Sequence, residues 1–344
     1  MKGSVIALDH LRGKEAAALM IDGQLDDIVV ALPDGGVAPE TIFRGKMGRP
    51  VKGLGGAFVD LPDGQRGFLR QTKGLRPGDP VLVQVAGLAE QGKAIPLTTR
   101  LLFKSRYAIV TPDAPGLNIS RQIVDDDLRA ALDDLATNAM DGAQTGMGLI
   151  LRSACAEAGD SAITEDIARM RELAEQVLAD ITGTPECLVA AAGPHMAAWR
   201  DWPLPDTLDD AAGSFQRHNV PEAVDALLGA HVPLSSGGHM QVQVTSAFVT
   251  IDVNTGPDTS QAAGLKANIA AARELPRQLR LRGLGGQVVI DFAPCAKKDR
   301  QVLEQSLRAA FRRDGRDTVL AGWTPLGNYE LTRKRDRVSL HACL

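Results

Sequence analysis

Two aspartates and one asparagine have the side chains needed to bind a divalent cation. Asp252 lies between two apolar residues, and Asp291 follows the apolar run 288–290. Because alternate side chains of a strand share a face, Asp252 and Asn254 would point away from the core on which their apolar neighbours pack. Carboxylate and amide oxygens suit Mg²⁺ or Mn²⁺, and such an ion would hold a phosphate oxygen and activate water. We therefore predict a catalytic metal site at Asp252 and Asp291, with Asn254 beside them.

A purely structural role is the alternative for each aspartate. Either one could cap the end of its strand or accept a hydrogen bond from a turn, and for one aspartate taken alone this explanation is at least as good as metal binding. A buried charge is costly unless it is paired or bound to a cation, and open sheets commonly bind ligands at the carboxyl ends of their strands. Since both aspartates end apolar strands in the same segment, we favour a shared site.

Basic residues are concentrated around the two aspartates. One group lies within residues 266–282, and its members are Lys266, Arg273, Arg277, Arg280 and Arg282. Three of them, Arg273, Arg277 and Arg280, recur at i, i+4 and i+7 and would share one helical face. Further basic runs lie within residues 297–313 and 333–335. Lysine and arginine dominate affinity for phosphate chains, so we favour a nucleic-acid surface over an ordinary solvated helix face.

The region 41–104 has the short strands and glycine-rich turns of a small β-barrel. Phe58 and Phe68 lie in two of these strands among small neighbours. Exposed aromatic residues on a barrel of the OB type stack the bases of single-stranded nucleic acid. Two aromatic residues packed inside the barrel core are the alternative, and spacing alone favours that alternative.

Composition indicates an ordinary globular protein with more than one domain. The chain has 344 residues, 44% of them hydrophobic and 23% charged, and a net charge of −4. We find no apolar run of the roughly 18 residues that a membrane span requires and no secretory signal at the start. The four cysteines form no Cys-x-x-Cys pair, which predicts reduced thiols, a cytoplasmic location and no structural zinc site within the chain.

The C-terminal third contains the elements that would position the aspartates. Alternating apolar residues predict a hairpin at 241–253, and a helical period follows over 265–279, interrupted at Pro276. Gly285 and Gly286 precede a short buried strand at 288–290. The other predicted elements are a basic helix at 299–313, a final strand near 328–331, helices at 126–137 and 163–182, and short strands within 1–40.

Longer motifs resemble the ribonuclease E/G family. Residues 250–256 read TIDVNTG, residues 277–286 read RQLRLRGLGG, and residues 289–292 read VIDF. The closing motif LTRKR follows at 331–335. Weaker similarity covers most of the rest, and the segments that carry it are FRGK at 43–46, AFVD at 57–60, GFL at 67–69, LTT at 97–99, ISR at 119–121, GLILRS at 148–153 and SSGG at 235–238.

The resemblance implies an α+β, multidomain fold in which an OB-type β-barrel is inserted in an N-terminal α/β region. By similarity the chain has four regions. Residues 1–40 would form the first strands of an RNase-H-like region, and residues 41–104 would form the OB-fold RNA-binding barrel. Residues 105–235 would contain a 5′-phosphate sensor and a trimmed RNase-H-like region, and residues 236–344 would form a DNase-I-like α/β catalytic domain.

The resemblance also implies an activity and its catalytic residues. The expected protein is a metal-dependent endoribonuclease in RNA processing or decay, which hydrolyses single-stranded RNA and leaves 5′-phosphate and 3′-hydroxyl ends. By similarity Asp252 and Asp291 would bind Mg²⁺, or Mn²⁺ in its place, and Asn254 would orient Asp252. Arg121, Arg152 and the Ser153 hydroxyl would form the sensor for a 5′-monophosphate, an anion that the two-donor fork of arginine suits. The residues expected to bind RNA are Phe58, Phe68 and Lys93 in the barrel by resemblance, together with Arg280 and Arg282 of the basic surface.

The sequence departs from the family pattern at several positions. Relatives carry a cysteine pair after the closing motif that shares zinc between subunits, whereas the sequence has Cys343 alone there, and we expect no small dimerisation domain beyond it. We therefore expect any homo-oligomer to form without shared zinc. Ser153 replaces the usual threonine, so we expect a weaker phosphate sensor, and we expect Pro276 to kink its helix.

An RNA-binding protein of the same fold with little or no cleavage is the alternative function. The missing zinc link and the short middle region favour that alternative, whereas the retained Asp252, Asn254 and Asp291 favour the nuclease. A small-molecule enzyme is disfavoured, because the sequence has no glycine-rich nucleotide loop and no Ser/His/Asp arrangement. We therefore expect a nuclease.

Overall fold

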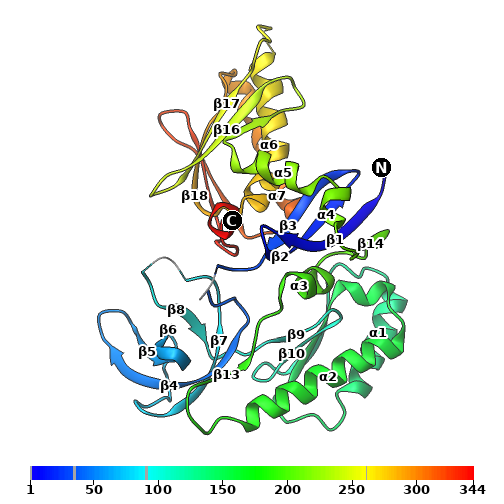
Figure 1. Ribbon diagram of the computed structural model, residues 1–344, viewed down its shortest axis with the longest axis vertical. Coiled ribbons are helices and arrows are strands. Elements are labelled where there is room, and N and C mark those ends of the chain that lie inside the picture. The colour runs from blue at the N-terminus through cyan, green and yellow to red at the C-terminus, as the bar shows by residue number, and fades with distance from the viewer. Residues whose placement is uncertain (1, 34–35, 90–91, 261) are drawn as a thin grey trace. The chain divides into compact units, whose positions relative to one another are not determined.

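Four β-sheets and the helices packed on them build the residues that the computed structural model describes, namely 2–33, 36–89, 92–260 and 262–344 (Figure 1). The protein is thus mixed α+β, as the sequence predicted. The chain divides into two units, one formed by residues 1–33 and 205–344 and the other by residues 34–204. Each unit contains two of the sheets and is described by itself.

A six-stranded sheet in the first unit carries both predicted catalytic aspartates. Its strands, in spatial order, are β15 (His231–Pro233), β16 (His239–Val244), β17 (Val249–Asn254), β18 (Gly286–Asp291), β20 (Tyr329–Arg333) and β19 (Thr318–Trp323). The helices α6 (Ala263–Leu281) and α7 (Arg300–Asp314) share its core, which includes Met240, Ile251, Leu275, Ile290 and Leu307. One face of the sheet is therefore apolar and covered by helices.

The predicted hairpin is confirmed as β16 and β17. In β17 the buried Ile251 and Val253 alternate with the exposed Asp252, as a strand with one covered face requires. The turn is closed by Thr245, whose hydroxyl donates to the Phe248 carbonyl oxygen at 2.8 Å and accepts from the Phe248 amide at 3.1 Å. This alternation decides that the aspartate lies on the uncovered face.

The other elements predicted in this region are also present, with one addition. As predicted, the helix runs through the buried Pro276, which lies inside α6 and costs one intrahelical hydrogen bond without ending the helix. The edge strand β19 was not predicted, because its side chains are only partly buried and its register shifts between Leu320 and Gly322. An edge strand with a bulge shows little of the alternation that marks a strand in a sequence.

The second sheet of this unit combines segments from the start and the middle of the chain. Its strands, in spatial order, are β14 (Thr207–Asp209), β1 (Ser4–Leu11), β2 (Lys14–Ile21) and β3 (Gln24–Val30), and it is followed by α4 (Ser214–Arg217) and α5 (Val220–Leu228). Its core contains Phe215 and Val224 together with Leu281 from the end of α6 and Leu340 from α8 (Leu340–Cys343). The predicted N-terminal strands therefore share a core with the helix that leads to β18.

A closed five-stranded barrel forms part of the second unit, as predicted. Its strands are β4 (Ile42–Val51), β5 (Gly56–Asp60), β6 (Arg66–Leu69), β8 (Ile95–Thr98) and β7 (Pro80–Val85), with β13 (Glu186–Val189) added beside β4 and the short η1 (Pro62–Gly64) between β5 and β6. The pairing of β7 with β4 closes the barrel. Gly67 is needed for close packing here, because a Cβ at this position would lie 2.1 Å from the Leu97 side chain.

The residues predicted to sense a 5′-phosphate follow strands of the remaining sheet of the second unit. Its strands, in spatial order, are β11 (Gly116–Ile119), β12 (Gly148–Leu151), β10 (Ala108–Thr111) and β9 (Phe103–Lys104). The predicted helices are confirmed as α1 (Asp126–Ala139) and α2 (Asp160–Ala179), and the shorter elements η2 (Ser153–Glu157) and α3 (Pro194–Asp201) complete the region. Leu132 of α1, Leu149 of β12 and Ile163 of α2 belong to one core. No helix among the described residues combines the length and apolar composition that crossing a bilayer requires.

Candidate active site

The structure places Asp252 and Asp291 side by side. They are register partners in the parallel pair β17 and β18, and neighbouring strands lie about 4.8 Å apart. Both residues are exposed, whereas Ile251 and Ile290, which precede them, are buried. The two carboxylates therefore lie next to each other on the uncovered face, at the carboxyl ends of their strands.

Asn254 fixes the orientation of one of these carboxylates. Its Nδ2 donates to Asp252 Oδ2 at 2.9 Å, because the two side chains are two residues apart on the same face of β17. The structure thus brings together all three residues predicted for this site. This hydrogen bond restricts the rotation of the Asp252 carboxylate.

The chemistry of this donor set fits a hard divalent cation. Two like charges on adjacent strands repel each other, and no cationic side chain among the described residues forms an ion pair with Asp252 or Asp291. The described residues also contain no cluster of three or more His, Cys, Asp or Glu side chains able to hold a metal. An ion bound here would take few protein ligands and would fill the rest of its shell with water and substrate phosphate, as Mg²⁺ commonly does.

A buried asparagine that was not predicted as a site residue holds the segment after Asp291. Asn268 of α6 donates from Nδ2 to the Ala293 carbonyl oxygen at 2.8 Å and accepts from the Ala293 amide at 3.0 Å. Gly264 allows the same close approach, because a Cβ there would lie 2.0 Å from the Pro294 carbonyl oxygen. The sequence signal for this role was an asparagine on the apolar face of a helix, where an unpaired amide would be costly.

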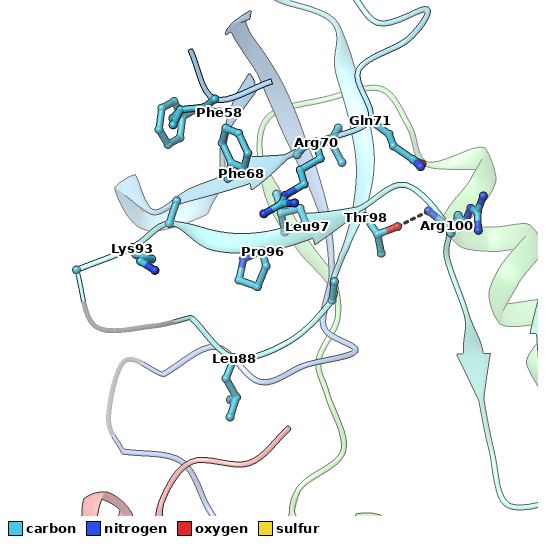
Figure 2. A pocket seen from close by; sticks show the side chains of 15 residues that line it. Phe58, Phe68, Arg70, Gln71, Leu88, Lys93, Pro96, Leu97, Thr98 and Arg100 are labelled. Carbon is cyan, nitrogen blue, oxygen red and sulfur yellow. Dashed lines mark hydrogen bonds between the residues drawn. The ribbon is translucent and has the colours of Figure 1, made fainter. Parts of the chain in front are cut away.

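The barrel carries an open groove with two aromatic rings in it. Phe58 of β5 and Phe68 of β6 are cross-strand partners, and their ring centroids lie 5.5 Å apart at an interplanar angle of 68°. Both are partly exposed and neither belongs to the barrel core. They line a cavity of about 980 Å³ together with Lys93, Arg70 and Arg100 (Figure 2). The geometry favours the predicted surface pair over the alternative of a buried pair.

Comparison with known proteins identifies the family. The model of the ribonuclease E/G family matches residues 103–209 and 206–336, which together make up more than half of the chain. The chain belongs to the ribonuclease E/G family.

Relatives of this family align along nearly the whole chain. Ribonuclease E of Nostoc sp. is 26% identical over 397 aligned residues, which cover 99% of this chain and 56% of the relative. Ribonuclease E of Synechocystis sp. is 28% identical, with 99% and 58% covered. Ribonuclease G of Escherichia coli is 26% identical, with 95% of this chain and 82% of the relative covered. The chain thus spans little more than half the length of the two ribonuclease E relatives.

The residues expected to sense a 5′-phosphate in this ribonuclease E/G chain follow two neighbouring strand ends. β11 and β12 run parallel, so that Arg121 and Arg152 follow the ends of adjacent strands. Arg121 is exposed, and so is Ser153 at the start of η2. Arg152 instead donates to three backbone carbonyl oxygens, those of residues 105, 106 and 200, and to the carboxylate of Asp201 at 2.8 Å.

Asp201 is the centre of a cluster of cations in the second unit. Lys104, Arg152 and Arg200 lie 2.9, 2.8 and 2.8 Å from its carboxylate. Burial raises the pKa of Asp201, but hydrogen bonds and charges from Arg200 and Lys104 outweigh burial and lower this pKa to about 2. The carboxylate of Asp201 thus accepts from the Arg152 guanidinium, which the resemblance assigned to a terminal phosphate.

Arg280 and Arg282, predicted to bind RNA, lie in the interior of the first unit. The Arg280 side chain is 13% exposed, and it pairs with Asp26 and with Asp314. Arg282 is 8% exposed, and it donates to Gln278 and to the Gly229 carbonyl oxygen. Their guanidinium donors are used inside the fold, which is the structural reason why neither offers a surface contact to phosphate.

Other basic residues of the first unit remain exposed. Lys297 and Lys298 belong to η3 (Lys297–Asp299), a few residues after the end of β18, and both are exposed. The exposed side chains of the later basic runs are Arg308, Arg312, Arg313, Lys334 and Arg335. Cationic surface is therefore available on this unit from residues other than the two arginines that were predicted.

Proposed function

We propose that this chain is an Mg²⁺-dependent endoribonuclease that hydrolyses single-stranded RNA in RNA processing or decay and leaves 5′-phosphate and 3′-hydroxyl ends. The observation that carries the proposal is the pair of adjacent exposed carboxylates, Asp252 and Asp291, one of them oriented by Asn254. The family membership supports an action on RNA, since the aligned relatives are named ribonuclease E and ribonuclease G. Mn²⁺, which prefers similar ligands, would serve in place of Mg²⁺.

The roles of the chain's own residues follow from their positions. Asp252 and Asp291 would hold the cation, which when bound supplies positive charge at the scissile phosphate and lowers the pKa of water. Asn254 keeps the Asp252 carboxylate turned toward the site through its hydrogen bond. In the reaction a water molecule gives up one proton as its oxygen bonds to phosphorus, the bond from phosphorus to the 3′ oxygen breaks, and the 3′ oxygen takes up one proton.

The barrel would hold the RNA as a single strand. Bases free of a duplex can stack on aromatic side chains, and Phe58 and Phe68 present partly exposed rings in the groove. Lys93, Arg70 and Arg100 line the same groove and would contact backbone phosphates. These contacts include no hydrogen bonds to the edges of bases, so they would allow many different single-stranded sequences to bind.

We propose that the 5′ end of the substrate has little influence on cleavage. A terminal phosphate would have to displace Asp201 from Arg152, Lys104 and Arg200 before it could bind there. Rates on the same RNA with a 5′-monophosphate and with a 5′-hydroxyl test this point. A ratio within about twofold supports it, and a large preference for the monophosphate would contradict it.

RNA binding without efficient cleavage is the second candidate function. The barrel groove lies in one unit and the carboxylates in the other, so the groove could bind RNA whether or not the carboxylates cleave it. An A/U-rich single strand incubated with Mg²⁺, with its products mapped at both ends, separates the two functions. Internal cuts with 5′-phosphate ends that disappear with a chelator support the nuclease, whereas tight binding without cuts supports the binding protein.

We further propose a cytoplasmic location and an assembly, if one forms, without shared zinc. All four cysteines are free thiols, which suits a reducing compartment. Cys343 lies in α8 and is 4% exposed, so its thiol is poorly placed to bind a metal shared with another subunit. The mass in solution with and without a chelator tests the second statement.

A further inference from the structure

Four polar side chains form a straight row across the sheet that carries the catalytic pair. His231 of β15 is the register partner of Gln241 in β16, and Gln241 is in turn the partner of Asp252 in β17. Asp252 is then the partner of Asp291 in β18. Since partners on adjacent strands share a face and lie about 5 Å apart, the row leads from the carboxylates to His231, roughly 10 Å from Asp252.

The pattern of burial confirms that this row lies on the uncovered face. Val232 and Met240, which alternate with the row on β15 and β16, are buried and belong to the core beneath α6 and α7. His231 is exposed, and Gln241 is partly exposed. The outer two strands therefore extend the surface on which the carboxylates lie.

A second histidine, His239, lies next to this row. His239 is the register partner of Asn254, and the centroid of its ring lies 4.7 Å from that of His231, with the two planes tilted by 33°. His231 is exposed and His239 is partly exposed. The two imidazoles thus make an aromatic stack at the edge of the active face, next to the residue that orients Asp252.

We propose that His231 and His239 form a subsite for the nucleobase of the nucleotide next to the scissile phosphate, with Gln241 available to hydrogen-bond to it. Histidine is among the side chains on which single-stranded bases stack, and a glutamine amide offers both donors and an acceptor to a base edge. The offset of roughly 10 Å places the base beside the phosphate and not over it. This inference rests on the proposed function, and it adds the part of the site that would position the substrate.

The test measures binding of a short single-stranded RNA by fluorescence anisotropy in the background Asp252→Asn, so that cleavage does not interfere. His239→Ala and His231→Ala are each expected to weaken binding about 5- to 100-fold, the range that stacking of one base supplies. His239→Phe is expected to retain most of the affinity, because it keeps an aromatic ring. The matched control is His341→Ala, which alters an exposed histidine of α8 in the same unit.

An abasic nucleotide locates the contact. Removing the base next to the cleavage position should weaken binding to the protein with both histidines and should have little effect on the His239→Ala variant. Unchanged affinity in both alanine variants, or an equal loss with His239→Phe, would overturn the proposal. A thermal melt of each variant excludes a folding defect.

Steady-state kinetics on an otherwise unaltered chain keep this proposal separate from the nuclease proposal. His239→Ala should raise KM more than it lowers kcat, since the residue would position substrate. If Asp252→Asn cleaves as fast as the parent chain, the proposed function fails, whereas the binding data still decide whether the histidine stack holds a base.

Discussion

Asp252 and Asp291 are register partners on two parallel strands, although the whole of α6 separates them in the chain. A strand, a crossover helix and a second parallel strand must bring both carboxyl ends to the same edge of a sheet. The apolar residues of α6 bury the other face of these strands. The position of the pair is therefore a consequence of the crossover and needs no long loop to create it.

The amide of Asn254 offers a first test of how the pair is oriented. Replacing Asn254 with alanine removes the 2.9 Å hydrogen bond to Asp252 and leaves both carboxylates in place. Loss of a group that orients a metal ligand typically lowers metal affinity or activity about 10- to 100-fold. The Mg²⁺ concentration for half-maximal cleavage should rise accordingly, and Gln243→Ala, an exposed change on the neighbouring strand β16, should leave it unaltered. An unchanged rate and Mg²⁺ requirement in Asn254→Ala would show that the hydrogen bond is incidental.

The aromatic pair of the barrel can be tested by binding alone. Phe58→Ala and Phe68→Ala should each weaken binding of single-stranded RNA by about 1–3 kcal/mol, the contribution of stacking one base. Neither ring is part of the barrel core, so the melting temperature should change little. Anisotropy titrations against Val124→Ala, a residue that is 83% exposed in the same unit, provide the comparison. Full affinity in both phenylalanine variants would mean that the bases stack elsewhere.

Arg280 should contribute to the free energy of unfolding and not to RNA affinity. It pairs with Asp314, whose side chain is 2% exposed and also pairs with Arg333. Asp314→Asn removes the carboxylate that pairs with the buried Arg333, and breaking a buried ion pair in this way costs about 3–5 kcal/mol. Asp314→Asn should lower the free energy of unfolding by roughly this amount in urea titrations. Arg280→Ala should lower it by less, because Asp314 keeps Arg333 as a partner, and Arg312→Ala, an exposed change on α7, should leave it unchanged.

Below the unfolding transition, the Arg280→Ala protein should bind RNA within about twofold of the parent. If the Arg280→Ala variant stays folded but binds RNA about tenfold more weakly, Arg280 contacts RNA directly, as its position in the basic sequence pattern predicted.

The Asp201 cluster predicts how the second unit responds to acid. The pKa of Asp201 in the fold is lowered to about 2 from its ordinary 3.8. A carboxyl group with a depressed pKa adds stability above its ordinary pKa, and this stability is lost as the pH falls through the folded value. Asp201→Asn should therefore be less stable than the parent at pH 7, and the difference should shrink between about pH 4 and pH 2. Urea unfolding at several pH values checks this, and a difference that is constant with pH would contradict it.

The sequence predicted that the two carboxylates lie together because the relevant information is local. Asp252 and Asp291 each interrupt or end an apolar strand, and the alternation of side chains shows which face they occupy. The barrel was predictable for the same reason, since glycine-punctuated strands such as β5 and β6 are visible in the sequence.

The arginines were misjudged because their partners are distant in the chain. Arg273, Arg277 and Arg280 have the spacing of a basic helical face, but nothing near them in the sequence shows that Leu25 and Asp26 of β3 contact Arg277 and Arg280. Whether a charge is solvated or paired depends on such long-range packing. The histidine stack was missed for a related reason: His231 and His239 meet only through the register of β15 on β16.

The central claim is that Asp252 and Asp291 act together in phosphodiester cleavage, and the rates of single substitutions test it most directly. The rate of internal cleavage of a single-stranded RNA with Mg²⁺ should fall at least about 100-fold in Asp252→Asn and in Asp291→Asn, since each change removes part of several kcal/mol of transition-state stabilisation. Asp317→Asn, an exposed change in the same unit, should cut at the parent rate, and all variants should bind the RNA with similar affinity. Cleavage by both site variants at the parent rate, with the same dependence on Mg²⁺, would contradict the account.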